Sequence, residues 1–142
     1  MIGSDKVKQA ITYIFFILFS VIVNAQDNKN SADIRFDIEE FNFGTIKQGE
    51  KIEYSFTFVN SGKEPLIISD AKGTCGCTVP SWSKEPIPKG GKGSVNVEFN
   101  STGKLGMQDK TVTIISNAKS GPKVLRLKGN IETTTSQDNQ RQ

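Results

Sequence analysis

The sequence predicts an all-β fold, a sandwich of about seven strands. Apolar and polar residues alternate along most of the chain after residue 25, as in strands with one face toward a core and the other toward water. Clusters rich in glycine, asparagine, serine and proline interrupt this alternation roughly every 8–15 residues, the spacing expected of a β-sandwich. No window in this part repeats apolar residues at helical spacing, so we expect essentially no helix there.

The first segment, residues 1–25, is typical of a secretory signal peptide. Lys6 and Lys8 precede an apolar run over residues 10–23, and the small residue Ala25 follows it. The run is shorter than the roughly 20 residues that a membrane-spanning helix needs, which favours cleavage after Ala25 over a retained anchor. We therefore predict an exported protein, periplasmic or secreted, with no membrane attachment after cleavage.

One domain is predicted between two polar segments. Residues 26–32 form a polar lead-in, residues 33–131 form the sandwich, and residues 132–142 form a tail that we expect to be disordered because it has no large apolar side chain. A domain of this length can bury a core of its own without disulfide staples.

The predicted strands follow from the alternation and from the turns between them. They cover residues 33–38, 41–46, 50–60, 65–71, 75–79, 92–100, 109–116 and 122–131, and the first two count as one bent strand in the total of about seven. The third segment has the clearest pattern, since one of its faces carries Ile52, Tyr54, Phe56 and Phe58. Before the fourth segment, Gly62 marks a tight turn and Pro65 marks a strand start, where no ladder N–H is needed.

Several short phrases occur in a fixed order along the chain: "FNFGTIKQGE", "FVNSGKEPL", "PKGGKGSVNVEF", "TVTIISN" and "LKGN". Together they resemble the immunoglobulin-like domains of the ASH and major-sperm-protein type. A closer resemblance is to a secreted bacterial family, abundant in Bacteroidota and known as a domain of unknown function, whose signature is an N-G-x-x-P-L turn followed by C-x-C-T. Here the turn spans residues 60–66, with Ser61 inserted, and the second segment is Cys75, Cys77 and Thr78. The resemblance covers residues 41–131 and implies an immunoglobulin-like sandwich and export, but no reaction.

Cys75 and Cys77 are the two cysteines of the chain, and they lie on the predicted strand 75–79. Side chains two apart on a strand share a face, with Cα atoms roughly 6.5–7 Å apart, at or beyond the limit for an unstrained disulfide. Gly76 between them can adopt backbone angles that bring the two sulfur atoms together.

Four roles are open for this pair. The first is structural, as buried thiols or a local disulfide, because cysteine is among the most buried residue types. The second is a metal site for Cu(I), which accepts two soft sulfur ligands, whereas a tetrahedral zinc site lacks ligands in a chain without histidine. The third is thiol–disulfide exchange, and the fourth is a bridge between two chains. We predict no cofactor, with Cu(I) on Cys75 and Cys77 as the alternative.

Trp82 lies in the polar, proline-rich stretch "TVPSWSKEPIPK". It is either a core anchor at the cysteine end of the sandwich or an exposed contact for a partner, since tryptophan often carries interfaces.

The composition argues against an enzyme. Without histidine there is no Ser-His or Cys-His dyad, and carboxylates such as Glu53 and Glu98 sit singly along the sequence. The net charge of +3 comes from interspersed residues, so no clustered basic face indicates nucleic-acid binding.

We predict an extracytoplasmic, non-catalytic binding or structural module. Its protein partner would dock on an edge strand or on the end between Cys75 and Trp82. The alternative is a periplasmic Cu(I)-binding or thiol-redox protein.

Overall fold

The computed structural model describes residues 3–9 and 30–134. The apolar run and cleavage site of the predicted signal peptide, most of the lead-in and the tail from residue 135 lie outside these residues. Residues 4–9 form a short helix. In the two described ranges, no helix has the length and apolar character needed to cross a membrane.

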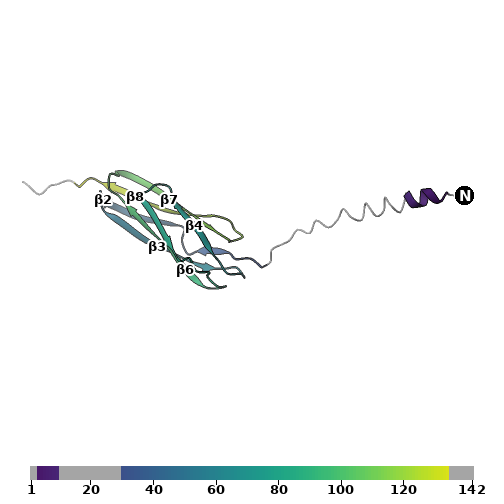
Figure 1. The fold of residues 1–142 in the computed structure, drawn as a ribbon. Coiled ribbons are helices and arrows are strands. Elements are labelled where there is room, and N and C mark those ends of the chain that lie inside the picture. Colours follow the sequence, from purple (N-terminus) through teal and green to yellow (C-terminus); the bar gives the residue numbers. More distant parts are fainter. Residues whose placement is uncertain (1–2, 10–29, 135–142) are drawn as a thin grey trace, which may run out of the picture.

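Two four-stranded sheets pack face to face over the described residues 30–134 (Figure 1). The strands are β1 (Ile34–Phe36), β2 (Glu40–Lys47), β3 (Lys51–Asn60), β4 (Ile68–Gly73), β5 (Thr78–Trp82), β6 (Lys92–Asn100), β7 (Gly106–Ser116) and β8 (Lys123–Glu132). One sheet has the order β1-β3-β6-β5 and the other has the order β2-β8-β7-β4. The predicted all-β, immunoglobulin-like sandwich is confirmed.

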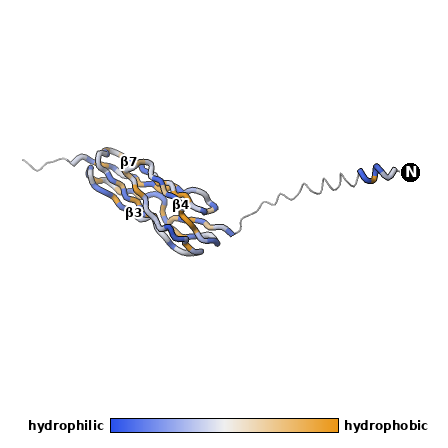
Figure 2. Tube along the Cα trace, in the orientation of Figure 1, coloured by the Kyte–Doolittle hydropathy of each residue, from blue (hydrophilic) through white to orange (hydrophobic). Residues whose placement is uncertain are grey.

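The core lies between the sheets and is built by the alternation seen in the sequence. Fully buried side chains come from both sheets, and they include Phe56, Val95, Val97, Phe99, Val112, Ile114, Leu125 and Leu127. Along the strands, apolar residues are interspersed with polar ones (Figure 2). Phe41 of β2 stacks on Tyr54 of β3 with ring centroids 3.8 Å apart, which joins the two sheets near one pair of edges.

Asn60 organises the end of the sandwich at which the lead-in enters, which we call the N-terminal end. Its side chain is buried, and its Nδ2 donates to the carbonyl oxygens of Glu64 at 2.8 Å and Ile87 at 2.9 Å. Its Oδ1 accepts from the N–H of Gly62 at 3.0 Å. A Cβ on Gly62 would collide with the backbone of residues 31–33, so this turn requires glycine.

Some strand boundaries differ from the prediction because tertiary contacts decide them. The predicted strand 65–71 begins only at Ile68, since the side chain of Asn117 donates to Pro65 O and accepts from Ile67 N. The predicted strand 75–79 begins at Thr78, so the cysteines precede the strand instead of lying on it. That prediction was wrong because Cys75–Thr78 forms a turn, closed by the Thr78 N–H donating to Cys75 O at 3.1 Å.

Candidate functional site

Cys75 and Cys77 form a disulfide in the turn that carries the chain from β4 in one sheet to β5 in the other. Their Cα atoms are 5.2 Å apart, closer than two alternate positions of a strand, because the turn shortens the distance. Both side chains are half-buried, and Cys77 packs against the core. The Thr78 hydroxyl oxygen lies 3.6 Å from Cys75 Sγ and 4.0 Å from Cys77 Sγ, and it is the donor to sulfur atoms that carry no proton.

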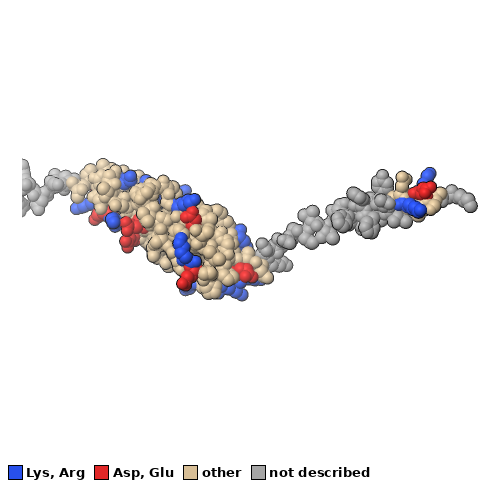
Figure 3. All heavy atoms as spheres, viewed as in Figure 1, with Lys and Arg blue, Asp and Glu red and all other residues tan. Residues whose placement is uncertain are grey.

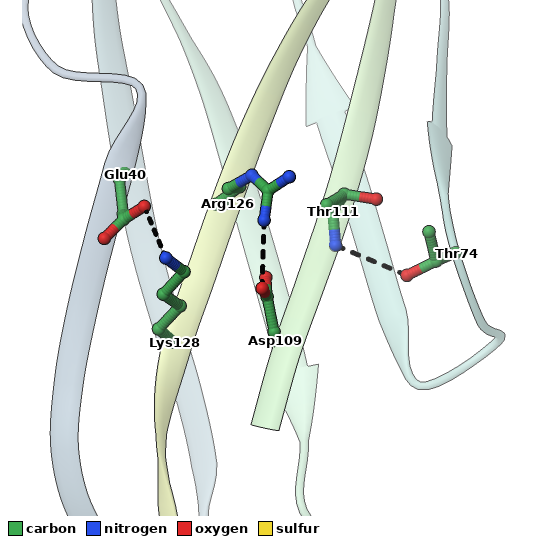
Figure 4. Close-up of polar contacts among 6 residues, drawn as sticks. All are labelled: Glu40, Thr74, Asp109, Thr111, Arg126 and Lys128. Atoms are coloured by element: carbon green, nitrogen blue, oxygen red, sulfur yellow. Dashed lines mark hydrogen bonds and ion pairs between the residues drawn. The ribbon is translucent and has the colours of Figure 1, made fainter. Parts of the chain in front are cut away.

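Both sheets hold this turn in place. On the β7 side, the Thr74 N–H donates to Thr111 O at 3.0 Å, and the Thr111 N–H donates to the Thr74 hydroxyl oxygen at 3.3 Å (Figure 4). On the β6 side, the Asn100 N–H donates to Cys77 O at 2.9 Å. The backbone position of the turn is therefore fixed by hydrogen bonds that do not involve sulfur.

The two glycines of this region have different roles. Gly73 sits against Thr78, and a Cβ on Gly73 would collide with the Thr78 carbonyl oxygen. Gly76, between the cysteines, is not among the glycines with positive φ, and a Cβ there would meet no atom within 4 Å apart from the two neighbouring cysteines. The sequence predicts that special backbone angles at Gly76 bring the sulfur atoms together. In the structure the turn over residues 75–78 brings the sulfur atoms together, and Gly76, which has no side chain, lies exposed at the tip of this turn.

Beyond the disulfide turn, β7 continues past the end of β4. The ladder pairs Gly73 with Val112 and then Thr74 with Thr111, so the next position of β7 opposite the turn is Lys110. By alternation Lys110 shares the inner face of its sheet with buried Val112, whereas Asp109 points to the outer face. We call the turn 75–78, the loop 101–105 and residues 106–110 of β7 the disulfide end.

Trp82 connects the two sheets. Its indole is half-buried against the core, and its Nε1–H donates to Ile68 O on β4 at 3.0 Å. The ammonium group of Lys84 lies 3.5 Å from the indole centroid and covers the ring. This geometry favours the core-anchor role over an exposed contact, and a partner contact through Trp82 stays a prediction.

The edge strands β4 and β5, on the Trp82 side, offer few free backbone groups to an added strand. On the side of β4 that pairs with no strand, Ile68 O accepts a hydrogen bond from the Trp82 indole. On the same side, the Ala71 N–H donates to the Asp70 carboxylate at 2.8 Å. The free side of β5 carries Pro80, which has no N–H to offer an added strand. Such devices protect native edges from pairing with another chain.

The opposite edges carry comparable devices. β1 has three residues, and the Asp33 carboxylate accepts from the Ile34 N–H at 3.0 Å on its free side. β2 pairs in parallel with β8 and is broken by a bulge, where Gly44 has φ 72° and its N–H donates to Asn42 Oδ1 at 2.8 Å. The predicted docking of a partner strand therefore meets an obstacle at each of the four edges of the described domain.

The outer faces of the sheets are polar. On the β2-β8-β7-β4 sheet, Glu40 pairs with Lys128 and Asp109 pairs with Arg126, both at 2.9 Å (Figure 4). Basic and acidic residues are mixed on the face that Figure 3 displays.

The outer face of the β1-β3-β6-β5 sheet is hollowed, with a volume of about 550 Å³. The β3–β6 register places Glu53 directly opposite Glu98 there, and Lys51 pairs with Glu98 at 3.2 Å. The sequence placed these carboxylates singly, and only the register brings them together. Glu53 is exposed, and Glu98 is half-buried with its carboxylate paired to Lys51.

The predicted Cu(I) site stays a prediction. The structure brings Cys75 and Cys77 together, but their sulfur atoms are bonded to each other, and a metal requires free thiolates. Among the described residues, no cluster of three or more cysteine, aspartate or glutamate side chains has the geometry of a metal site.

Comparison with solved structures gives the same fold. A protein of unknown function from Porphyromonas gingivalis W83 is similar with a TM-score of 0.64 and 14% identity over 77% of this chain and 51% of its own. PapD-like domain 7 of human CEP192, an ASH / PapD-like domain, has a TM-score of 0.55 and 14% identity over 72% and 87%. The secreted serine protease VesC from Vibrio cholerae has a TM-score of 0.55 and 15% identity over 70% and 23%.

These likenesses concern the fold alone, and the chain spans about half of the Porphyromonas protein and a smaller part of the protease. No curated protein matches the chain. A protein family does match, over residues 34–131, which is nearly the whole sandwich and more than half of the chain. The chain therefore belongs to the family described as "Protein of unknown function (DUF1573)".

Proposed function

We propose that this chain is an extracytoplasmic, non-catalytic interaction module, and that its protein partner docks at the disulfide end. The choice of the disulfide end over an edge strand rests on the devices that blunt β1, β2, β4 and β5. An ASH / PapD-like fold and a chain without histidine are both in keeping with a module that binds instead of catalysing.

The observation that carries the proposal is the exposure of large apolar side chains at this end. Leu105, in the loop after β6, is 53% exposed, and Met107, at the start of β7, is 79% exposed. Methionine and leucine on a surface are the kind of side chains that pack against a partner, and flexible methionine adapts to irregular partners. The loop 101–105 and the disulfide turn both cross between the sheets, and they are adjacent because Cys77 hydrogen-bonds the last residue of β6.

Export is supported by two independent features. The leader pattern of residues 1–25 is that of a secreted protein, and a disulfide persists in oxidising compartments such as the periplasm. The secreted, Bacteroidota-type group with its C-x-C-T segment remains a prediction from the sequence.

Site-specific photo-crosslinking in the producing cells tests the docking surface. A photoreactive residue at position 105 should give one discrete adduct, while the same residue at Val124 should give none. Val124 is the matched control because it is 43% exposed and apolar but lies at the N-terminal end. Adducts of equal yield at both positions, or a discrete adduct only from Asn42 on the β2 edge, would overturn the proposed surface.

A further inference from the structure

We propose that the Cys75–Cys77 disulfide is a thiol–disulfide exchange site that accepts two electrons from a dithiol on a partner protein or peptide. This goes beyond the proposed docking function and does not depend on it, because a small dithiol can test it. Three features of the turn carry the inference: its hydrogen bonds, its open tip, and the polar groups around the sulfur atoms.

The turn keeps its backbone hydrogen bonds whether or not the sulfur atoms are bonded. Thr74 is bonded to Thr111, Cys77 to Asn100, and Thr78 to Cys75 O, and none of these contacts uses sulfur. The disulfide itself closes a loop of only three residues, so it constrains little of the chain. The bond can therefore open and close within the folded domain, as an exchange site requires.

The tip of the turn is open to an attacking group. Gly76 is exposed, and apart from its neighbours Cys75 and Cys77 no atom lies within 4 Å of the position that its Cβ would occupy. Cys75 and Cys77 are both half-buried at the surface, but only Cys77 packs against the core. An incoming thiolate therefore has its clearer approach to the sulfur atom of Cys75.

The surroundings favour sulfur in its anionic form. The Thr78 hydroxyl lies within 4.0 Å of both sulfur atoms and can donate to either one. Lys110 follows the ladder by one position: Thr111 bonds to Thr74, the residue before Cys75, and half-buried Lys110 comes next on β7, on the same inner face as Val112. The neighbouring carboxylate, Asp109, faces the other side of the sheet, where Arg126 pairs with it. A cation placed on this side of the turn would attract a thiolate and stabilise it.

The exchange is balanced in atoms and electrons. A thiolate of the partner attacks Cys75 Sγ, the S–S bond breaks, and Cys77 leaves as a thiolate that accepts a hydrogen bond from Thr78 and then a proton. The second thiolate of the partner attacks the partner sulfur of the mixed disulfide and releases Cys75. The partner dithiol has then lost two electrons and two protons, and the cysteine pair has gained both.

The first experiment measures reduction of the oxidised full chain by dithiothreitol in increasing urea below the unfolding transition, with alkylation and mass spectrometry as the readout. Exchange in the folded state predicts a rate that does not change with urea. It also predicts that Lys110→Gln slows reduction several-fold, while Lys92→Gln leaves it unchanged. Lys92 is the matched control because it makes the same charge change at the N-terminal end. A rate that rises steeply with urea, or equal rates for the two variants, would overturn the proposal.

A second experiment uses single-cysteine variants to test which sulfur is attacked. With Cys77→Ser, the remaining Cys75 should form a mixed disulfide with the aromatic disulfide 5,5′-dithiobis(2-nitrobenzoate) several-fold faster than Cys77 does in Cys75→Ser. Circular dichroism first checks that both variants are folded. The reverse order of rates, or no reaction at either cysteine in the folded state, contradicts the proposed exchange.

Discussion

At the scale of single residues, Gly73 and Gly76 have different surroundings although both lie within two residues of Cys75. Gly73 is needed because the Thr78 carbonyl occupies the space of a Cβ, whereas Gly76 faces solvent with a backbone conformation open to other residues. Nothing in the sequence distinguishes the roles of these two glycines. The packing of Gly73 against Thr78 at the start of β5 does so in the structure.

Replacing each of these glycines with alanine should therefore have opposite outcomes. Gly73→Ala should lower the free energy of unfolding by about 1–3 kcal/mol, the cost of forcing an atom into a packed site. Gly76→Ala should change it by less than about 0.5 kcal/mol, as at other open surface positions. Urea denaturation followed by circular dichroism measures both values. A loss at Gly76 as large as that at Gly73 would show that the turn is strained at its tip.

Asn60 gives a second prediction at this scale. Asn60→Ala removes the side-chain partner of two partly buried carbonyls and of the buried Gly62 N–H, and should lower the free energy of unfolding by about 1–3 kcal/mol. Asn117→Ala is a matched control, since it also removes two side-chain bonds to backbone but at an exposed site that water can reach. Chemical denaturation should show the smaller loss for Asn117. Equal losses of unfolding free energy in the two variants would mean that the burial of Asn60 does not make its hydrogen bonds more important for stability.

At the scale of strands, local alternation predicts the elements and long-range contacts determine their limits. The predicted strand 92–100 coincides with β6, and the predicted strand 50–60 differs from β3 by one residue, because both strands alternate strictly. The disulfide turn, the Glu53–Glu98 pair and the Trp82–Ile68 bond depend instead on how distant segments pair. The two-residue alternation does not specify which residues of neighbouring strands pair with each other. The sequence alone therefore identified Cys75, Cys77 and Trp82 as candidate residues but did not predict their contacts.

The hydrogen bond from the Trp82 indole to Ile68 O covers part of the β4 edge, and it leads to a prediction at the scale of strands. Trp82→Phe keeps an aromatic ring but removes the donor to Ile68 O, and should cost about 0.5–1.5 kcal/mol of stability. The uncovered edge should also make the variant self-associate at high concentration, as sedimentation velocity would show. Lys84→Ala removes only the cation over the ring and should remain as monodisperse as the unchanged chain. Self-association of both variants to the same degree would assign the effect to the ring face instead of the edge.

At the scale of the whole molecule, the two ends of the sandwich present different surfaces. Residues 30–33 lie at the N-terminal end, and β8 runs toward the opposite end (Figure 1). The disulfide turn lies toward that opposite end, since Thr78 pairs with Phe99 near the end of β6. The N-terminal end is closed by buried Asn60 and by the bridge between Leu66 and Ile87. The disulfide end instead exposes Leu105 and Met107 beside a bond that can be broken chemically. Buried Ser101, whose hydroxyl donates to Glu50 O at 2.6 Å, closes the interior behind this exposed surface.

This division predicts that the disulfide contributes little to the stability of the whole domain. Closing a loop of three residues removes roughly 1–2 kcal/mol of chain entropy from the unfolded state, and the fully buried side chains between the sheets are unchanged, with half-buried Cys77 packing only at their margin. The Cys75→Ser/Cys77→Ser variant should therefore keep the strand-rich circular dichroism spectrum and lose no more than this amount in urea denaturation. Because the hydrogen bonds of the turn persist, hydrogen exchange of the Asn100 and Thr78 N–H groups should remain slow in the variant. Global unfolding of the variant under native conditions would show that the disulfide is a structural staple, and would remove the basis for treating it as a bond that opens within the folded protein.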